Sequence, residues 1–240
     1  MKIVDQTMPE AGGRWAFDAD VTAAFDDMLA RSIPQYDVMR RLCLDLGSAF
    51  VQRGTDVIDL GCSRGEALSP FVDRFGAYNR FIGCDVSGPM LDAARERFSG
   101  YERTGVVRVI DHDLRKGPPP ARPSLTLCVL TLQFTPIEYR HRIVQACYDQ
   151  TVSGGAMILV EKVLGNDAKT DGAFTDLYLG MKAENGYTAE QIDRKRASLE
   201  GVLVPVTARW NEELLHSAGF ARVECFWRWL NFAGWIAVKP

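Results

Sequence analysis

The sequence predicts an α/β protein with a doubly wound, mostly parallel, seven-stranded sheet. Short apolar runs rich in β-branched residues alternate with amphipathic segments of helical period. A glycine-rich turn follows the first run, and the second run ends in an acidic residue about twenty residues later. Alternating strands and helices with short links are typical of a parallel sheet covered by helices on both faces, with its ligand at the carboxyl ends of the strands.

Two helices are predicted before the first strand, within residues 1–51. Apolar residues recur at helical spacing over residues 20–31 and again over residues 37–51. Two interpretations stay open: the helices fold over the ligand pocket as a lid, or they pack on the flank of the sheet. Tyr36 lies in the break between them, and we predict that it contacts the ligand.

The first strand and the turn after it form the predicted nucleotide-type pocket. Val57, Ile58 and Leu60 suit a strand that is covered on both faces. Glycines in the turn allow positive φ, and the helix that we expect to begin near Glu66 presents free N–H groups to a ligand. The residues of this stretch predicted to bind the ligand are Asp59, Gly61, Cys62, Ser63 and Gly65.

Later strands bring further groups to the same edge of the sheet. The second strand ends in Asp85, followed by Val86, where a carboxylate binds a ribose. The third strand leads to Asp113 and Leu114. Asp113 either accepts from an adenine amino group, with Leu114 offering its backbone N–H, or serves only as a turn residue. The fourth strand places Val129 beside the transferred group.

The pattern changes after the fifth strand. Residues 166–209 contain no strand-like run, and we predict an inserted helical segment with Lys195 and Arg196 among its charged residues. A hairpin then closes the sheet. The chain is thus predicted to form a single domain over residues 1–240, with its core at residues 52–165 and 210–240.

Composition narrows the classes of function. The 240 residues are 47% hydrophobic and 25% charged, and a formal net charge of -3 gives no general affinity for nucleic acid. The cysteines are scattered and the histidines lie far apart, so we predict buried free thiols and no metal site. The sequence shows no signal peptide and no apolar run of membrane-spanning length, so we expect a cytoplasmic protein.

Several stretches resemble a known superfamily and one family within it. The spacing Asp-x-Gly-x-x-x-Gly over residues 59–65, with Asp85 at the end of the next strand, resembles the class I S-adenosylmethionine (SAM) methyltransferases and their Rossmann-like fold. Longer stretches resemble the carboxy-S-adenosyl-L-methionine (carboxy-SAM) synthases. The matching stretches are residues 15–18, positions within 21–36, and residues 59–65, 131–134, 161–162, 185–187, 195–196, 199–200, 218–220 and 231–234.

The resemblance implies a cofactor, a substrate and two catalytic residues. Members bind SAM or carboxy-SAM and carboxylate the SAM methyl group with prephenate, through an ylide that captures the carbon dioxide prephenate loses. Arg196 matches the family's arginine, which suits the new carboxylate, and Tyr36 matches its pocket tyrosine. The resemblance further implies a homodimer whose product serves a downstream transferase in modification of wobble uridine in tRNA, without direct nucleic-acid binding by this chain.

The chain departs from the family pattern near the expected cofactor. Val129 stands where the family has an asparagine, Val86 alters the pair after the second strand, and Arg64 and Glu66 replace smaller or apolar residues. Two other functions therefore stay open. One is a SAM-dependent methyltransferase of a small molecule or nucleic acid, and the other is a non-enzymatic relative that presents SAM or carboxy-SAM to a partner enzyme.

Overall fold

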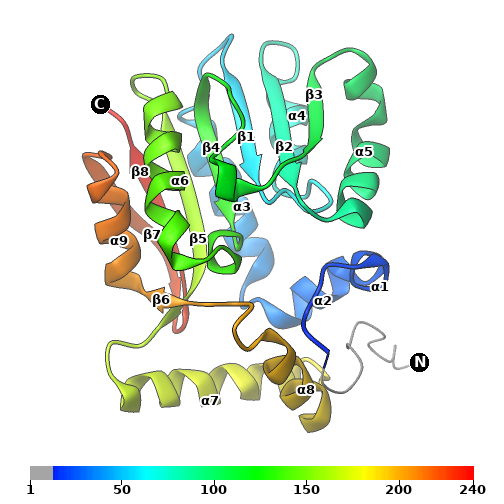
Figure 1. Cartoon of the computed structure of the whole chain (residues 1–240), viewed down its shortest axis with the longest axis vertical. Coiled ribbons are helices and arrows are strands. Elements are labelled where there is room, and N and C mark those ends of the chain that lie inside the picture. The colour runs from blue at the N-terminus through cyan, green and yellow to red at the C-terminus, as the bar shows by residue number, and fades with distance from the viewer. Residues whose placement is uncertain (1–12) are drawn as a thin grey trace.

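The computed structural model describes residues 13–240, which build one eight-stranded sheet with helices on both faces (Figure 1). The predicted fold class is confirmed. The strands are β1 (Asp56–Leu60), β2 (Arg80–Asp85), β3 (Val107–Asp111), β4 (Pro123–Val129), β5 (Ala156–Leu164), β6 (Val206–Thr207), β7 (Arg222–Trp229) and β8 (Phe232–Val238). The helices are α1 (Ala19–Ala23), α2 (Phe25–Ser32), α3 (Tyr36–Ser48), α4 (Ser69–Phe75), α5 (Gly88–Arg103), α6 (Ile137–Gln150), α7 (Ala168–Glu184), α8 (Ala189–Leu199) and α9 (Ala208–Ser217), with short 3-10 turns η1 (Leu114–Lys116) and η2 (Leu132–Phe134).

The strand order reverses between β1 and β4, where the ligand pocket of such a sheet is expected. The order is β3-β2-β1-β4-β5-β8-β7, and β1 to β5 run parallel. The closing hairpin is antiparallel, as the sequence predicts. The expectation of no strand within residues 166–209 is wrong at one place, because β6 pairs with the end of β5. The two residues of β6 are too few to show the alternation of apolar and polar side chains that indicates a strand.

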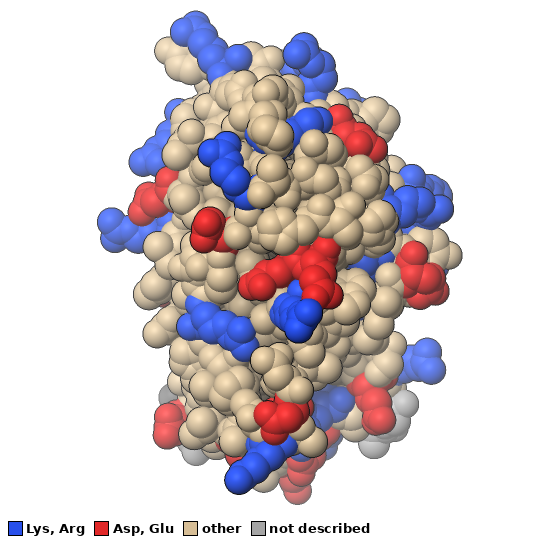
Figure 2. Space-filling model, turned by 90° about the vertical axis from the view of Figure 1, so that its left-hand side faces the viewer, with Lys and Arg blue, Asp and Glu red and all other residues tan. Residues whose placement is uncertain are grey.

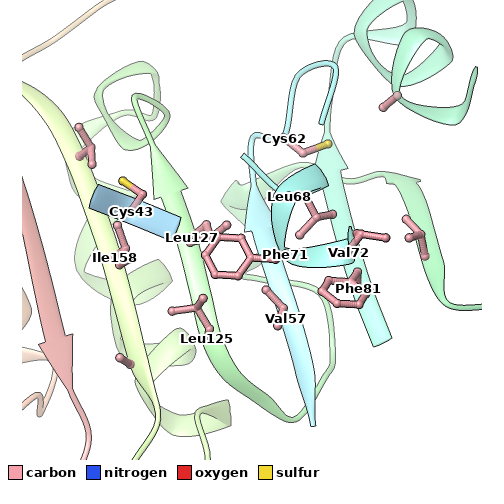
Figure 3. Close-up of a cluster of buried hydrophobic side chains, with 14 of the residues drawn as sticks. Cys43, Val57, Cys62, Leu68, Phe71, Val72, Phe81, Leu125, Leu127 and Ile158 are labelled. Carbon is pink, nitrogen blue, oxygen red and sulfur yellow. The ribbon is translucent and has the colours of Figure 1, made fainter. Parts of the chain in front are cut away.

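Both faces of the sheet are buried against helices. On one face, α3 and α4 cover β1, β4 and β5, and Figure 3 shows Phe71 of α4 among Val57, Leu125 and Leu127. On the other face, α6 and α9 cover the same central strands. All five residues of β1 are buried, as expected of a central parallel strand, and two of them, Asp56 and Asp59, are acidic.

The helix after the first turn begins at Ser69, not near Glu66 as predicted. Gly65 has a φ of +83°, which ends any helical path through it, and residues 66–68 form turns instead. Pro70 lies in the first turn of α4, where its missing N–H has no helical partner to lose. The later start follows from these two residues.

The remaining helices extend the molecule beyond the carboxyl ends of the strands. Figure 1 shows α1, α2, α7 and α8 below the sheet edge at which β1 and β4 end. The Trp15 N–H donates to the Ser198 carbonyl at 2.9 Å, and Arg31 Nε donates to the Asn185 carbonyl at 3.0 Å. The N-terminal helices and the inserted segment therefore form one connected layer.

No helix within residues 13–240 is both long and apolar enough to cross a membrane. The prediction that no signal peptide opens the chain concerns residues 1–10, which lie outside the described residues.

Candidate active site

A cavity of about 580 Å³ lies at the carboxyl ends of β1, β2, β4 and β5. Its roof comes from the layer beyond the sheet: Phe25, Met28 and Leu29 of α2, Tyr178 of α7 and Leu199 of α8 border it. The α2 helix thus lies over the pocket, whereas α3 packs on the face of the sheet. Each of the two open interpretations of the N-terminal helices describes part of the structure. The volume is in the range of small-molecule sites.

The turn after β1 runs along one wall of this cavity with little space behind it. Gly61 has a φ of +70°, and a Cβ there would lie 2.3 Å from Thr131 Cγ2. A Cβ on Gly65 would lie 2.3 Å from Phe98 Cε2. Gly61 and the adjacent Cys62 and Ser63 border the cavity, but Gly65 does not. Gly65 therefore acts through packing, unlike the ligand contact that the sequence predicts for it.

Asp85 is held by three backbone N–H groups at the end of β2. Its Oδ2 accepts from Ser63 N–H at 2.9 Å, and its Oδ1 accepts from Val86 N–H at 2.7 Å and Ser87 N–H at 3.0 Å. The carboxylate borders the cavity, as does Val86, whose own side chain is exposed. Since a carboxylate has about four lone-pair positions, acceptor capacity remains for a ligand hydroxyl.

Asp59 is a buried carboxyl group in the wall of the cavity. Its Oδ2 has no hydrogen-bond partner among the described residues. Burial raises the pKa of Asp59 to about 7, and the nearby Arg40 acts in the opposite direction. An unpartnered buried oxygen at this place fits a ligand that brings a hydrogen-bond donor or a positive charge.

Tyr36 borders the cavity at the start of α3. Burial raises its pKa to about 12, so the phenol keeps its proton at neutral pH and can donate a hydrogen bond. The Arg40 guanidinium lies 5.9 Å from the centre of the Tyr36 ring. The two residues are one helical turn apart and face the same space.

Asp113 and Leu114 also border the cavity, and Asp113 has a structural partner as well. The Asp113 carboxylate accepts from the Arg115 N–H at 2.9 Å and forms an ion pair with the Arg115 side chain at 2.6 Å. These bonds hold its pKa below the usual value. Asp113 therefore caps the turn η1. Because it also borders the cavity, the alternative that it accepts a hydrogen bond from an adenine amino group stays a prediction.

The exit from β4 is fixed by a buried carboxyl group. Glu161 accepts from the N–H groups of Leu132 at 2.9 Å and Gln133 at 2.8 Å. Burial raises the pKa of Glu161 to about 8. This contact holds the segment that follows Val129, a residue that borders the cavity. An apolar group therefore lines the wall at that position.

Arg196 is exposed on α8 and does not border the cavity. The buried residues of this helix are Ile192, Lys195 and Ser198, so the position after Lys195 turns about 100° away from them. The Arg196 charge is nonetheless one cause, after burial, of the lowered pKa of Lys162, which borders the cavity.

Other cavity residues were not among the predicted ligand contacts. Lys162 and Tyr178 border the cavity, as do Arg40 and Lys195. Two of them carry a usable signal: Arg40 follows Tyr36 by four helical positions, and Lys162 lies near the end of a parallel strand. Tyr178 carries none, because only the packing of α7 under the sheet brings it there.

The described residues hold no group of three or more His, Cys, Asp or Glu that is arranged to bind a metal ion. Five of the six cysteines are buried and Cys225 is exposed, and all six are free thiols.

Comparison with known proteins identifies the family. Residues 57–155 match a family model described as a methyltransferase domain. The chain is 39% identical over 226 residues to a carboxy-S-adenosyl-L-methionine synthase of Methylococcus capsulatus, covering 94% of this chain and 93% of the relative. It is 40% identical to the protein of the same name from Wolinella succinogenes, covering 94% of each chain.

Among solved structures, an O-methyltransferase family protein from Burkholderia thailandensis matches with a TM-score of 0.65 at 19% identity. The match covers 93% of this chain and 60% of that protein, and at this identity it shows the fold alone. The resemblance seen in the sequence is confirmed by the two close relatives, and the chain belongs to the carboxy-S-adenosyl-L-methionine synthase family, whose members are SAM-using transferases.

Proposed function

We propose that this protein is a carboxy-SAM synthase that converts SAM and prephenate to carboxy-SAM and phenylpyruvate. The observation that carries the proposal is that the cavity of this chain, a member of the carboxy-SAM synthase family, is bordered both by the acidic groups of Asp59 and Asp85 and by the ammonium of Lys162. Such a division of charge suits a cationic substrate bound beside an anionic one.

SAM would bind with its ribose at Asp85 and its chain along the turn Gly61–Ser63. The fixed carboxylate oxygens of Asp85 suit the ribose hydroxyls, and Leu114, which borders the same cavity, would offer its backbone N–H to the adenine. The unpartnered Oδ2 of Asp59 suits a donor or positive charge of the amino acid part of SAM.

The reaction balances without a further reactant. The SAM methyl group gives up a proton, and its carbon forms a bond to the carbon dioxide released by prephenate. The electron pair of the broken carbon–carbon bond makes the prephenate ring aromatic as the ring hydroxyl leaves. The lost proton and the hydroxide form water, and the sum of charges is the same on both sides.

Arg196 and Tyr36 are the residues to which we assign the carboxylate that is formed. Arg196 would bind both its oxygens through the guanidinium, after the side chain turns from the exposed side of α8 toward the cavity. Tyr36, which borders the cavity as a protonated phenol, would donate its hydroxyl to the ligand.

Arg196→Ala tests this assignment. Because a bidentate charged contact is lost, we expect carboxy-SAM formation to fall at least about tenfold while the Kd of SAM stays within about twofold. Product is measured by mass spectrometry and SAM affinity by calorimetry. The matched control is Arg194→Ala, which removes an exposed arginine two positions earlier on the same helix. Equal product from Arg196→Ala and wild type would remove Arg196 from the mechanism.

The second candidate function is that of an ordinary SAM-dependent methyltransferase, and the residue that favours it is Val129. It borders the cavity with a side chain that cannot hydrogen-bond, at the position where the family's asparagine stands. Formation of S-adenosylhomocysteine with an added acceptor would favour this candidate.

The wider role that we propose is cytoplasmic synthesis of carboxy-SAM for a downstream transferase that modifies tRNA. Direct contact with nucleic acid is not part of it: on the face shown in Figure 2, basic and acidic side chains are interspersed and form no extended basic area. A homodimer is also part of the proposal, as the family resemblance implies.

A further inference from the structure

Lys162 is a half-buried cation at one end of the cavity. It is part of β5, three strands from Asp85 on β2, so about 14 Å separates them at about 4.8 Å per strand. Its backbone N–H donates to Gln133 Oε1 at 2.8 Å, and its Nζ lies 4.8 Å from the centre of the Tyr178 ring. The ammonium is therefore held between the sheet and α7, which passes beneath β5 in Figure 1.

No ion pair joins Lys162 to an Asp or Glu within residues 13–240. Burial lowers its pKa first, and the charge of Arg196 lowers it further, with Asp171 acting weakly in the opposite direction. Lys162 thus borders the cavity without an ion-pair partner among the described residues. Such an arrangement is stabilised when an anionic ligand enters.

The chemistry of the second substrate decides which carboxylate belongs at Lys162. Prephenate has one carboxylate that leaves as carbon dioxide and one that stays in phenylpyruvate. A cation bound to the leaving carboxylate would stabilise the ground state more than the transition state, because the negative charge moves away as the bond breaks. A fixed cation therefore favours the reaction only when it binds the carboxylate that stays.

We infer that Lys162 binds the retained carboxylate of the second substrate and, with Tyr178 beside it, sets the specificity of the enzyme for an organic dicarboxylate. This inference rests on the proposed function and adds a residue to it. Arg196 and Lys162 then have separate anions: the carboxylate formed on SAM and the carboxylate that phenylpyruvate keeps.

The test compares Lys162→Met, which keeps most of the side-chain volume, with wild type. Phenylpyruvate, which contains only the retained carboxylate, is titrated calorimetrically into SAM-loaded protein. We expect its Kd and the KM for prephenate to rise at least about tenfold. The Kd values of SAM and of carboxy-SAM stay within about twofold. Lys169→Met, an exposed lysine of α7, is the matched control.

Two results would overturn the inference. One is an unchanged Kd for phenylpyruvate in Lys162→Met. The other is a raised Kd for carboxy-SAM instead of a raised Kd for phenylpyruvate, which would assign Lys162 to the transferred carboxylate. Lys162→Gln repeats the comparison with a polar side chain, and loss of SAM binding in both variants also contradicts the inference. Wild-type protein that binds phenylpyruvate through Lys162 yet forms no carboxy-SAM would refute the proposed function and support the assignment of Lys162.

Discussion

At the scale of single residues, the site depends on carboxyl groups whose surroundings differ. Asp85 has three backbone donors, Asp59 has an oxygen with no partner among the described residues, and Glu161 has two backbone donors deep in the protein. The sequence indicates Asp59 and Asp85, because both end buried strands. It could not separate a carboxylate that is already paired from one that is not, since that depends on the turns around it.

The raised pKa of Asp59 predicts that the free energy of unfolding depends on pH. Its pKa is near 3.9 in the unfolded chain and is raised to about 7 in the folded protein without ligand. Between these values the folded state binds more protons. Asp59 therefore contributes stability that is present below about pH 4 and is lost as the pH rises through about 7, by at most about 1.4 kcal/mol per pH unit.

Urea unfolding of ligand-free protein at several pH values measures this effect. Asp59→Asn should lose less stability than wild type between pH values of about 4 and 7, because its amide does not titrate. Asp73→Asn, on the exposed side of α4, is the control. Parallel curves for Asp59→Asn and wild type would show that the folded carboxyl group is not perturbed.

At the scale of elements, contacts of Arg64 connect the turn after β1 to the roof of the cavity. Arg64 of that turn donates to the Thr22 carbonyl at 3.2 Å and forms ion pairs with Asp26 at 3.2 Å and Glu66 at 3.3 Å. Arg64 and Glu66 are departures from the family pattern. Arg64 joins the turn after β1 to α1 and α2, and Glu66 forms an ion pair with Arg64.

Arg64→Ala should loosen this roof with little effect on global stability, because its ion pairs are partly exposed. Hydrogen exchange followed by mass spectrometry is expected to show faster exchange in residues 19–32 and unchanged exchange in α3. The comparison variant is Arg41→Ala, which removes an exposed pair with Asp45. Exchange in residues 19–32 that matches wild type would show that Arg64 does not hold the roof.

The elements of the sheet were largely predictable, and the layer over the cavity was not. Buried strands such as β1 and β8 appear in the sequence as short runs rich in apolar residues. The late start of α4 depends on the φ of Gly65, and β6 is too short to have a period. The roof depends on long-range contacts such as Arg31 with Asn185, which no local pattern encodes.

At the scale of the whole molecule, groups of opposite charge border one cavity at the carboxyl ends of the strands. The parallel strands bring Asp59, Asp85 and Lys162 to one edge of the sheet, and the N-terminal helices and the inserted segment enclose that edge. In the proposed reaction, such a covering layer would limit water at the site and protect a reactive carbon until carbon dioxide is captured.

The most direct test of this account is mass spectrometry of the SAM species after purified protein is incubated with SAM and prephenate labelled with ¹³C in its ring carboxylate. The account predicts a SAM species heavier by one labelled carbon dioxide, formed together with phenylpyruvate. Unmodified SAM with no prephenate consumed, or S-adenosylhomocysteine as the sole product, would contradict it and indicate that the chemistry diverged at Val129.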